Sequence, residues 1–223
     1  MKSDAVEFIA QSIWGSALSE EQRDRVISRA RDITVPEGGH IFHHGEKALY
    51  WVGLMRGEAV HQVSSADGKA AALTVAGAGS WFGEGTLMRE GQWRYDAVAR
   101  HASRVVLVPL AEFQWLCQTS LAFNQFLAKL LNDRLGHYIG LLSNDRLANP
   151  EARIARVIAS FYDPGMAIDR AALVPFSQTD IAALSGMSRQ RTNEALQKLQ
   201  SAGLLALGRF GIKVLDLDRL RDF

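Results

Sequence analysis

The chain has 223 residues, of which 48% are hydrophobic and 22% are charged, and these fractions are typical of a globular protein. A formal net charge of +1 excludes a protein coated in basic residues that binds nucleic acid indiscriminately, so any DNA contact has to be focused. The single cysteine, Cys117, excludes an intramolecular disulfide and any iron–sulfur cluster or zinc site that needs several thiolates from one chain.

Targeting and membrane segments are not recognisable in the sequence. No apolar run approaches the roughly 20 residues of a membrane span, and the N-terminal sequence MKSDAVEFIAQ lacks a signal-peptide pattern. We therefore expect a cytoplasmic protein with no membrane partner.

The first half of the chain changes from helical to β-type sequence. Residues 4–31 have a helical pattern, whereas short β-type runs separated by Gly-rich turns follow from Ile33 to Leu110. The expected strands are Ile33–Val35, His40–His43, Leu49–Met55, Ala59–Val63, Ala71–Val75, Tyr95–Ala99 and Arg104–Leu110. Short strands at such regular spacing predict an antiparallel sandwich or a small barrel.

The segment Trp81–Met88 interrupts this pattern of strands and turns. Gly83 and Gly85 flank Glu84 and let the backbone approach a ligand closely, and a following turn of helix could present N–H groups to an anion. Arg94 comes ten positions after Glu84 and is expected to begin a strand. Two interpretations remain open, a phosphate pocket or a β-bulge with a structural Glu84–Arg94 salt bridge.

A long helix is predicted over Leu121–Leu147, where many apolar residues follow a spacing of three and four. A helix of this length spans roughly 40 Å, more than a small domain, so part of its apolar face needs an external partner. A parallel homodimer is the simplest arrangement. Gly136 and Gly140 within it mark close helix approach or room for a ligand, or are incidental.

Asn149-Pro150 marks the expected domain boundary, because the residue before proline is disfavoured in the α region. An amphipathic helix over Glu151–Tyr162 follows, and then a predicted pair of helices in Ser177–Leu205. Ser177 and Ser188 are the expected N-caps, and Gly186 is the expected turn residue between the two helices.

The second helix of this pair is predicted to bury one apolar stripe and to expose a polar face. Arg, Gln, Asn and Glu side chains match the hydrogen-bonding edges of DNA bases, and the predicted outer face carries Arg189, Gln190, Asn193, Glu194 and Gln197. Two apolar runs around Gly208-Arg209-Phe210-Gly211 predict a β-hairpin wing with Arg209 at its tip. The alternative is an ordinary helical hairpin with a solvated face. Ser177–Val214 has five Lys and Arg residues against two acidic residues, a net charge of +3 that suits a phosphate backbone.

The order of these features resembles the CRP/FNR family of bacterial transcription regulators over nearly the whole chain. The matching stretches are IFHHGE (41–46), GEAVHQVSSADGK (57–69), GSWFGEGTLMREGQWR (79–94) and SGMSRQRTNEALQKLQSAGLL (185–205). The resemblance implies an α+β protein with a double-stranded β-helix (jelly-roll) sensor domain, residues 1–120. It also implies a dimerisation helix, 121–148, and a C-terminal winged helix-turn-helix, 149–223.

The resemblance further implies a homodimer whose β-roll senses an effector and reorients two recognition helices toward half-sites of a palindromic operator in double-stranded DNA. Base contacts are then expected from Arg189, Gln190 and Glu194, and phosphate contacts from Ser188, Arg191 and Arg209. Many relatives carry Arg where this chain has Glu194, so its operator should differ. The full predicted set of DNA-binding residues is Ser188, Arg189, Gln190, Arg191, Asn193, Glu194, Lys198 and Arg209.

The residues expected to bind the effector differ from those of relatives that bind cyclic AMP. In members that bind cyclic AMP, Glu84 would take the ribose hydroxyl and Arg94 the cyclic phosphate, but Tyr95 and Asp96 follow where a Ser or Thr is usual. Tyr138 and Ile139 stand where relatives carry Thr-Ser to hold adenine. The predicted effector-binding residues are Gly83, Glu84, Gly85, Arg94, Tyr95 and Tyr138. Cyclic AMP, haem on one of six histidines, another small organic effector and no ligand all remain open, whereas the missing cysteines exclude an iron–sulfur cluster of the FNR type.

Two other functional classes are alternatives to a DNA-binding regulator. The first is a cyclic-nucleotide-binding signalling module that acts mainly through protein partners, against which the outward Arg, Gln and Asn side chains argue. The second is an enzyme, which is not expected because the sequence has no nucleophile–base pair at useful spacing, no metal quartet and no Walker loop. Asp163-Pro164-Gly165 lies where some relatives touch RNA polymerase, a further expected partner.

Overall fold

The computed structural model describes residues 3–64, 70–147, 149–162, 174, 177–208 and 211–223. These form two compact units, Met1–Asn132 and Asp133–Phe223. The division between the units falls within one helix, α6 (Leu121–Leu147), which has the bounds that the sequence predicts.

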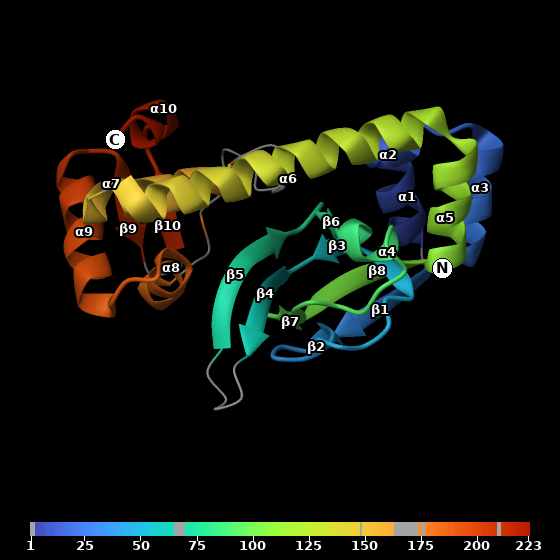
Figure 1. The fold of residues 1–223 in the computed structure, drawn as a ribbon, viewed down its shortest axis with the longest axis horizontal. Helices are drawn as coiled ribbons and strands as arrows, with labels where there is room; N and C mark the ends of the chain where they lie inside the picture. The colour runs from blue at the N-terminus through green and yellow to red at the C-terminus, as the bar shows by residue number, and fades with distance from the viewer. Residues whose placement is uncertain (1–2, 65–69, 148, 163–173, 175–176, 209–210) are drawn as a thin grey trace. The chain divides into compact units, whose positions relative to one another are not determined.

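Two four-stranded antiparallel sheets build the first unit (Figure 1). One sheet has the order β1 (Arg31–Val35), β8 (Ser103–Pro109), β3 (Tyr50–Arg56) and β6 (Trp81–Phe82). The other has the order β2 (His40–Phe42), β7 (Asp96–Ala99), β4 (Glu58–Ser64) and β5 (Ala70–Gly77). The predicted antiparallel two-sheet fold is confirmed, with every expected strand present. Only β6 was missed, because two residues are too few to show alternation.

Consecutive residues of β6 point to opposite faces of their sheet and so enter two different packed regions. Trp81 contacts Phe8 and Trp14 from the N-terminal helices, with ring centroids 5.4 and 4.9 Å away. Phe82 packs against Phe42 and His61 of the opposite sheet, with centroids 6.1 and 4.7 Å away. Both side chains belong to one hydrophobic cluster, in which Phe82 lies between the two sheets and Trp81 lies under the N-terminal helices.

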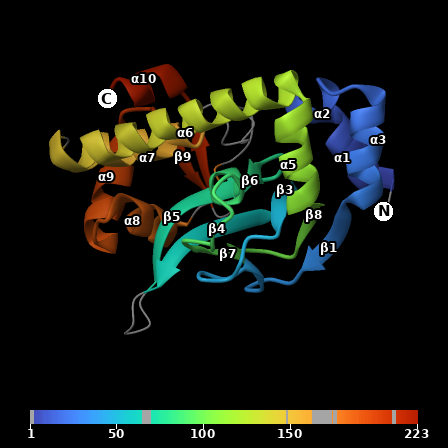
Figure 2. The same ribbon diagram turned by 45° about the vertical axis from the view of Figure 1, so that its right-hand side comes forward.

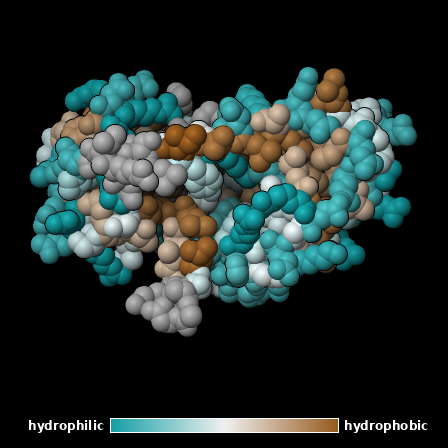
Figure 3. Space-filling model, viewed as in Figure 1, coloured by the Kyte–Doolittle hydropathy of each residue, from teal (hydrophilic) through white to brown (hydrophobic). Residues whose placement is uncertain are grey.

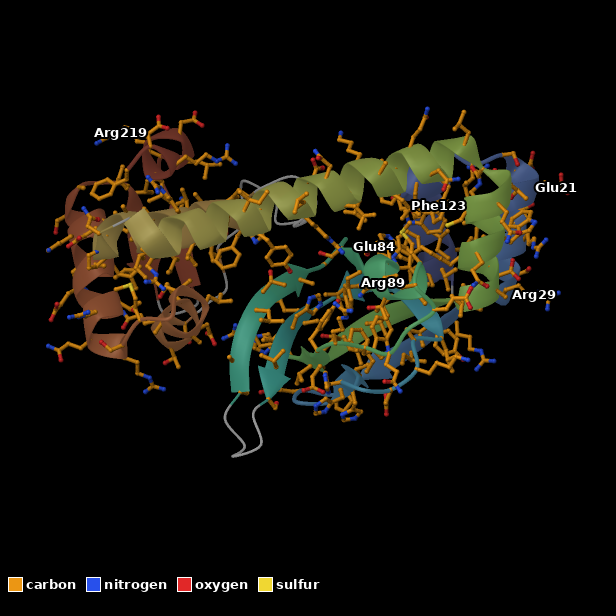
Figure 4. The ribbon with its side chains drawn as sticks, viewed as in Figure 1. Glu21, Arg29, Glu84, Arg89, Phe123 and Arg219 are labelled. Carbon is orange, nitrogen blue, oxygen red and sulfur yellow. The ribbon has the colours of Figure 1, made fainter. Side chains whose placement is uncertain are left out.

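The predicted N-terminal helical segment is divided into α1 (Ser3–Gln11), α2 (Ile13–Ser16) and α3 (Glu20–Arg29). Ser12 and Ser19 cause the divisions, because each side chain accepts a hydrogen bond from a backbone N–H three residues later and caps a new helix. α3 contacts both α1 and α5 (Leu110–Thr119), as Figure 2 shows. Phe123 lies where α6 meets α2 (Figure 4), with its ring 5.8 Å from that of Trp14.

The second unit contains the C-terminal helices and a two-stranded sheet. Its elements are α7 (Pro150–Ser160), α8 (Gln178–Ser185), α9 (Arg189–Ser201), β9 (Leu205–Gly208), β10 (Gly211–Val214) and α10 (Leu217–Arg221). Asn149 caps α7 by accepting from Ala152 N at 2.8 Å, so a new helix begins at Pro150. α10, whose N-cap is Asp216, was not predicted from the sequence. The expected turn at Asp163-Pro164-Gly165 lies outside the described residues.

No helix within the described residues is both long enough and apolar enough to cross a membrane.

Candidate nucleic-acid interface and effector pocket

Two capped helices meet at a glycine turn in the second unit, as predicted. Ser177 and Asp180 form a reciprocal capping box at the start of α8, in which Ser177 N donates to Asp180 Oδ2 at 2.7 Å. Gly186 ends α8 with φ 61°, a left-handed conformation that favours glycine. Ser188 then caps α9 by accepting from Arg191 N at 3.3 Å. Local hydrogen bonding therefore fixes both helix starts and the turn.

The buried stripe of α9 consists of the four residues expected from the sequence, Thr192, Ala195, Leu196 and Leu199. This stripe anchors α9 to its unit and determines which face remains outside. The residues proposed to contact DNA are exposed: Ser188, Arg189, Gln190, Arg191, Asn193, Glu194 and Lys198.

Some exposed side chains of α9 form hydrogen bonds within the protein, and others do not. Gln190 Nε2 donates to Glu194 Oε1 at 3.1 Å, which orients the amide and the carboxylate on neighbouring turns. Arg189 and Arg191 make no side-chain hydrogen bond or ion pair with any described residue. Their guanidinium groups are therefore available to an external partner.

Lys198, in contrast, is paired with Glu151 of α7. The hydrogen bond from Lys198 lowers the pKa of the Glu151 carboxyl and raises the pKa of the ammonium. A contact of Lys198 with DNA would therefore compete with this ion pair. Lys198 was predicted only from the local charge excess, which does not reveal a partner on another helix.

The expected wing hairpin is present as β9 and β10, which pair antiparallel from Gly211↔Gly208 to Val214↔Leu205. Val174 extends it, exchanging backbone hydrogen bonds of 2.8 Å with Ile212 in both directions. Arg209, the proposed tip residue, lies outside the described residues.

The segment proposed as an effector pocket lies between β6 and α4 (Glu84–Leu87) in the first unit. Gly83 has φ 98°, and a Cβ at this position would lie 2.6 Å from Trp93 Cη2. This glycine is thus required by its backbone conformation and by the close indole ring. Gly85, in contrast, is exposed and has open space at the Cβ position.

Glu84 and Arg94 occupy different environments. Glu84 is 2% exposed, on the single turn of α4 that Figure 4 shows, whereas Arg94 is exposed and precedes β7. The expectation that Arg94 begins a strand is wrong, because backbone pairing of β7 with β4 starts at Asp96. Arg94 forms no ion pair with any described residue, so the alternative of a structural Glu84–Arg94 salt bridge is also wrong.

Tyr95 and Asp96 point to opposite sides of the second sheet, as strand alternation predicts. The Tyr95 ring packs in the interior against Phe42 and His61, with centroids 5.5 and 4.8 Å away. Asp96 accepts a 2.9 Å hydrogen bond from His44 N and lies 3.9 Å from His43 Nδ1. Its Oδ1 therefore binds the turn after β2, and Asp96 makes no ion pair with Arg94.

Tyr138, the remaining proposed effector residue, lies on α6 in the second unit, is 41% exposed, and has its ring 5.4 Å from that of His137. Large apolar side chains are exposed along the same helix, namely Leu121 (75%), Leu135 (58%) and Ile139 (54%). Hydrophobic surface is visible along α6 in Figure 3.

Comparison with known proteins gives two family matches that cover most of the chain. Residues 32–120 match the cyclic nucleotide-binding domain, and residues 152–223 match the Crp-like helix-turn-helix domain. The first match contains the Gly83–Gly85 segment, and the second contains α8, α9 and the wing strands.

Two curated relatives and one solved structure extend these matches. The chain is 25% identical over 174 residues to the cAMP-activated global transcriptional regulator CRP of Pasteurella multocida, covering 77% of this chain and 83% of the relative. It is 27% identical over 212 residues to the cyclic AMP receptor protein of Thermus thermophilus, covering 92% and 93%. The structure of FixK2 from Bradyrhizobium japonicum matches with a TM-score of 0.73 at 20% identity, covering 86% and 96%. These relatives are regulators and receptors rather than enzymes. The chain belongs to the CRP/FNR family of transcription regulators, which join a cyclic nucleotide-binding β-roll to a DNA-binding helix-turn-helix.

Proposed function

We propose that this CRP/FNR-type regulator works as a homodimer that binds a palindromic operator through α9 and is controlled by an effector sensed in the β-roll. The observation that carries the proposal is the exposed face of α9, where two guanidinium groups have no partner among the described residues. We assign residues 1–120 to the sensor, 121–148 to the dimerisation helix and 149–223 to the DNA-binding domain. As a regulator of genomic DNA it would act in the cytoplasm.

The exposed apolar side chains of α6 support the dimer. Leu135 and Ile139 are four residues apart and share one helix face, and Leu121 lies on the same face about four turns toward the N-terminus. Large apolar groups this exposed on one helix are typical of an interaction surface. A parallel copy of α6 would cover them and place two recognition helices for half-sites about one DNA turn apart.

Replacing Arg189 by alanine is expected to relax base preference at one operator position. The first residue of α9 can bind a guanine edge through both guanidinium nitrogens, so its loss should reduce discrimination by about 1–3 kcal/mol, roughly 5- to 150-fold. The measurement is binding to operator DNA and to single-base variants of it across a salt series.

Arg191→Ala is the matched control, since it removes the same side chain from the same exposed turn. As a phosphate contact, its loss should weaken binding about equally on all sequences and reduce the salt slope by about one. If Arg189→Ala bound every sequence as the parent does, α9 would not be the base-reading element.

We propose that the effector is a ligand other than cyclic AMP. The residue after Arg94, a Ser or Thr in cyclic-AMP binders of the family, is Tyr95, and its ring is packed against Phe42 and His61 in the interior. No hydroxyl of a small side chain is left there for a cyclic phosphate. Tyr138 and Ile139 likewise replace the pair of small hydroxyl residues that holds adenine in those relatives.

Saturating cyclic AMP is accordingly expected to leave Tm unchanged. A ligand at 100 times its Kd stabilises the folded state by about 2.7 kcal/mol, which would raise Tm by several degrees. The measurement is thermal unfolding with cyclic AMP, cyclic GMP and haem in parallel, together with identification of any co-purifying ligand. A rise with cyclic AMP that Arg94→Ala abolishes would contradict the proposal.

A signalling module that acts only through protein partners is disfavoured by the match of residues 152–223 to the Crp-like helix-turn-helix domain. RNA polymerase remains a proposed additional partner of the DNA-bound dimer.

A further inference from the structure

Two histidines and one aspartate gather on the outer side of β2 and β7, outside both sites described above. β2 pairs with β7 through His40↔Val98 and Phe42↔Ala97, so the register shifts by one residue between His40 and Phe42. A shift of this kind changes the face to which a side chain points. Phe42 consequently enters the interior, where it stacks on Trp93 at 3.8 Å, while His40 stays exposed.

The bulge places His40 beside His43, which follows β2 directly. Their imidazole rings are stacked, with centroids 3.9 Å apart and planes 19° from parallel. Asp96, the first residue of β7, completes the group, and one ligand atom from each of the three lies within 4.8 Å of the others. Two adjacent strands of one sheet therefore bring together residues that are up to 56 positions apart in the sequence.

The Asp96 side chain is held in place, whereas the side chains of His40 and His43 are exposed. Its side chain is only 12% exposed, against 52% for His43, and its Oδ1 accepts the His44 N–H at 2.9 Å. No hydrogen bond from a described residue engages Oδ2. A buried carboxylate fixed through one oxygen with a second oxygen available is the arrangement of an anchored metal ligand.

We propose that His40, His43 and Asp96 form a binding site for a divalent late first-row transition metal ion, represented by Zn²⁺. Imidazole nitrogens select this class over Mg²⁺ and Ca²⁺, which prefer all-oxygen ligands. In a tetrahedral site with ligand atoms about 2.1 Å from zinc, the ligand atoms are about 3.4 Å apart. The ligand atoms of this cluster lie within 4.8 Å of one another, and rotation of the exposed imidazoles would bring them to the shorter separation. Three protein ligands leave a fourth position for water. A bound ion would connect the turn after β2, residues 43–46, to the first residue of β7. This proposal does not depend on the operator or effector proposals.

The test uses the full chain, stripped of metal by chelator dialysis and titrated with Zn²⁺ by calorimetry. Co²⁺ serves as a second probe, because its visible absorption reports tetrahedral coordination. The parent is expected to bind one ion per chain. His43→Ala and Asp96→Asn should each weaken that binding at least about tenfold, and His40→Ala should do the same. Asparagine keeps an acceptor for the His44 N–H, so Asp96→Asn preserves the turn while removing the charge.

His101→Ala is the matched control, since His101 is also an exposed histidine of the first unit but lies outside the cluster. It should bind Zn²⁺ and Co²⁺ as the parent does. Metal-free melting curves of His40→Ala and His43→Ala, both at exposed positions, verify that the fold is intact. The absence of saturable one-to-one binding in the parent, or unchanged binding in the His40→Ala, His43→Ala double variant, would overturn the assignment.

Discussion

Replacing both Leu135 and Ile139 by lysine is expected to convert the protein to a monomer and to weaken operator binding by about 10²- to 10⁴-fold. The two side chains are 58% and 54% exposed and lie four residues apart on α6. In a parallel dimer each would face its counterpart, so lysine would bring like charges together at a surface that buries apolar groups. When one recognition helix of a dimer is bound, the second helix is held near its half-site at a high effective concentration. A monomer lacks this advantage, so we expect its operator affinity to fall by the amount given above.

Sedimentation measures the oligomeric state of each variant, and a binding assay on the same preparation measures its affinity for operator DNA. Lysine adds positive charge, which by itself favours DNA, so a loss of affinity cannot be a simple charge effect. The matched control places two lysines at exposed glutamines of α1 and α5, Gln11→Lys with Gln118→Lys, and should remain dimeric. A Leu135→Lys, Ile139→Lys protein that still sediments as a dimer would show that another surface holds the two copies together.

Trp51→Ala is expected to destabilise the first unit by about 3–5 kcal/mol, a large part of the 5–15 kcal/mol that is typical of a whole domain. Trp51 on β3 is fully buried, and its ring contacts aromatic rings from four other elements. The centroid distances are 5.0 Å to Trp14, 4.5 Å to Trp81, 5.5 Å to Phe113 and Phe123, and 6.3 Å to Phe126. Alanine would leave a cavity where α2, β6, α5 and α6 meet.

Urea unfolding followed by far-UV circular dichroism measures the free energy of unfolding without relying on the removed indole. Trp115→Ala is the control, because Trp115 is only partly buried and its ring is covered by the Arg25 guanidinium at 3.8 Å. Its loss should cost about 1 kcal/mol. Equal costs for the two variants would mean that Trp51 is not the centre of this core.

The helix-turn-helix could be predicted almost residue by residue because its determinants are local. Ser177, Gly186 and Ser188 act through hydrogen bonds and backbone conformation within four positions along the chain. The stripe from Thr192 to Leu199 follows from helical periodicity alone. The strands could be predicted for the same reason, since their alternation and turns are local, and the bounds of α6 followed from its apolar spacing.

Side-chain environments set by distant segments could not be predicted in this way. The sequence left open whether Arg94 pairs with Glu84, and only the fold places Arg94 before β7 in an exposed position. It likewise gave no indication that Lys198 is paired with Glu151, because the two residues are 47 positions apart and meet only when α9 packs on α7.

The amino-acid sequence by itself determined most of the elements and their order, because caps, turns and hydrophobic periods act over a few residues. The family followed from the resemblance of four sequence stretches to those of CRP/FNR regulators. Only the tertiary structure decided to which side of the sheet the side chains of β2 point, because this depends on how β2 pairs with β7. A one-residue register shift between His40 and Phe42 separates a core phenylalanine from an exposed histidine and brings His40 and His43 to Asp96. Such a shift depends on how two strands distant in sequence pair, and the period of either strand alone does not contain that information.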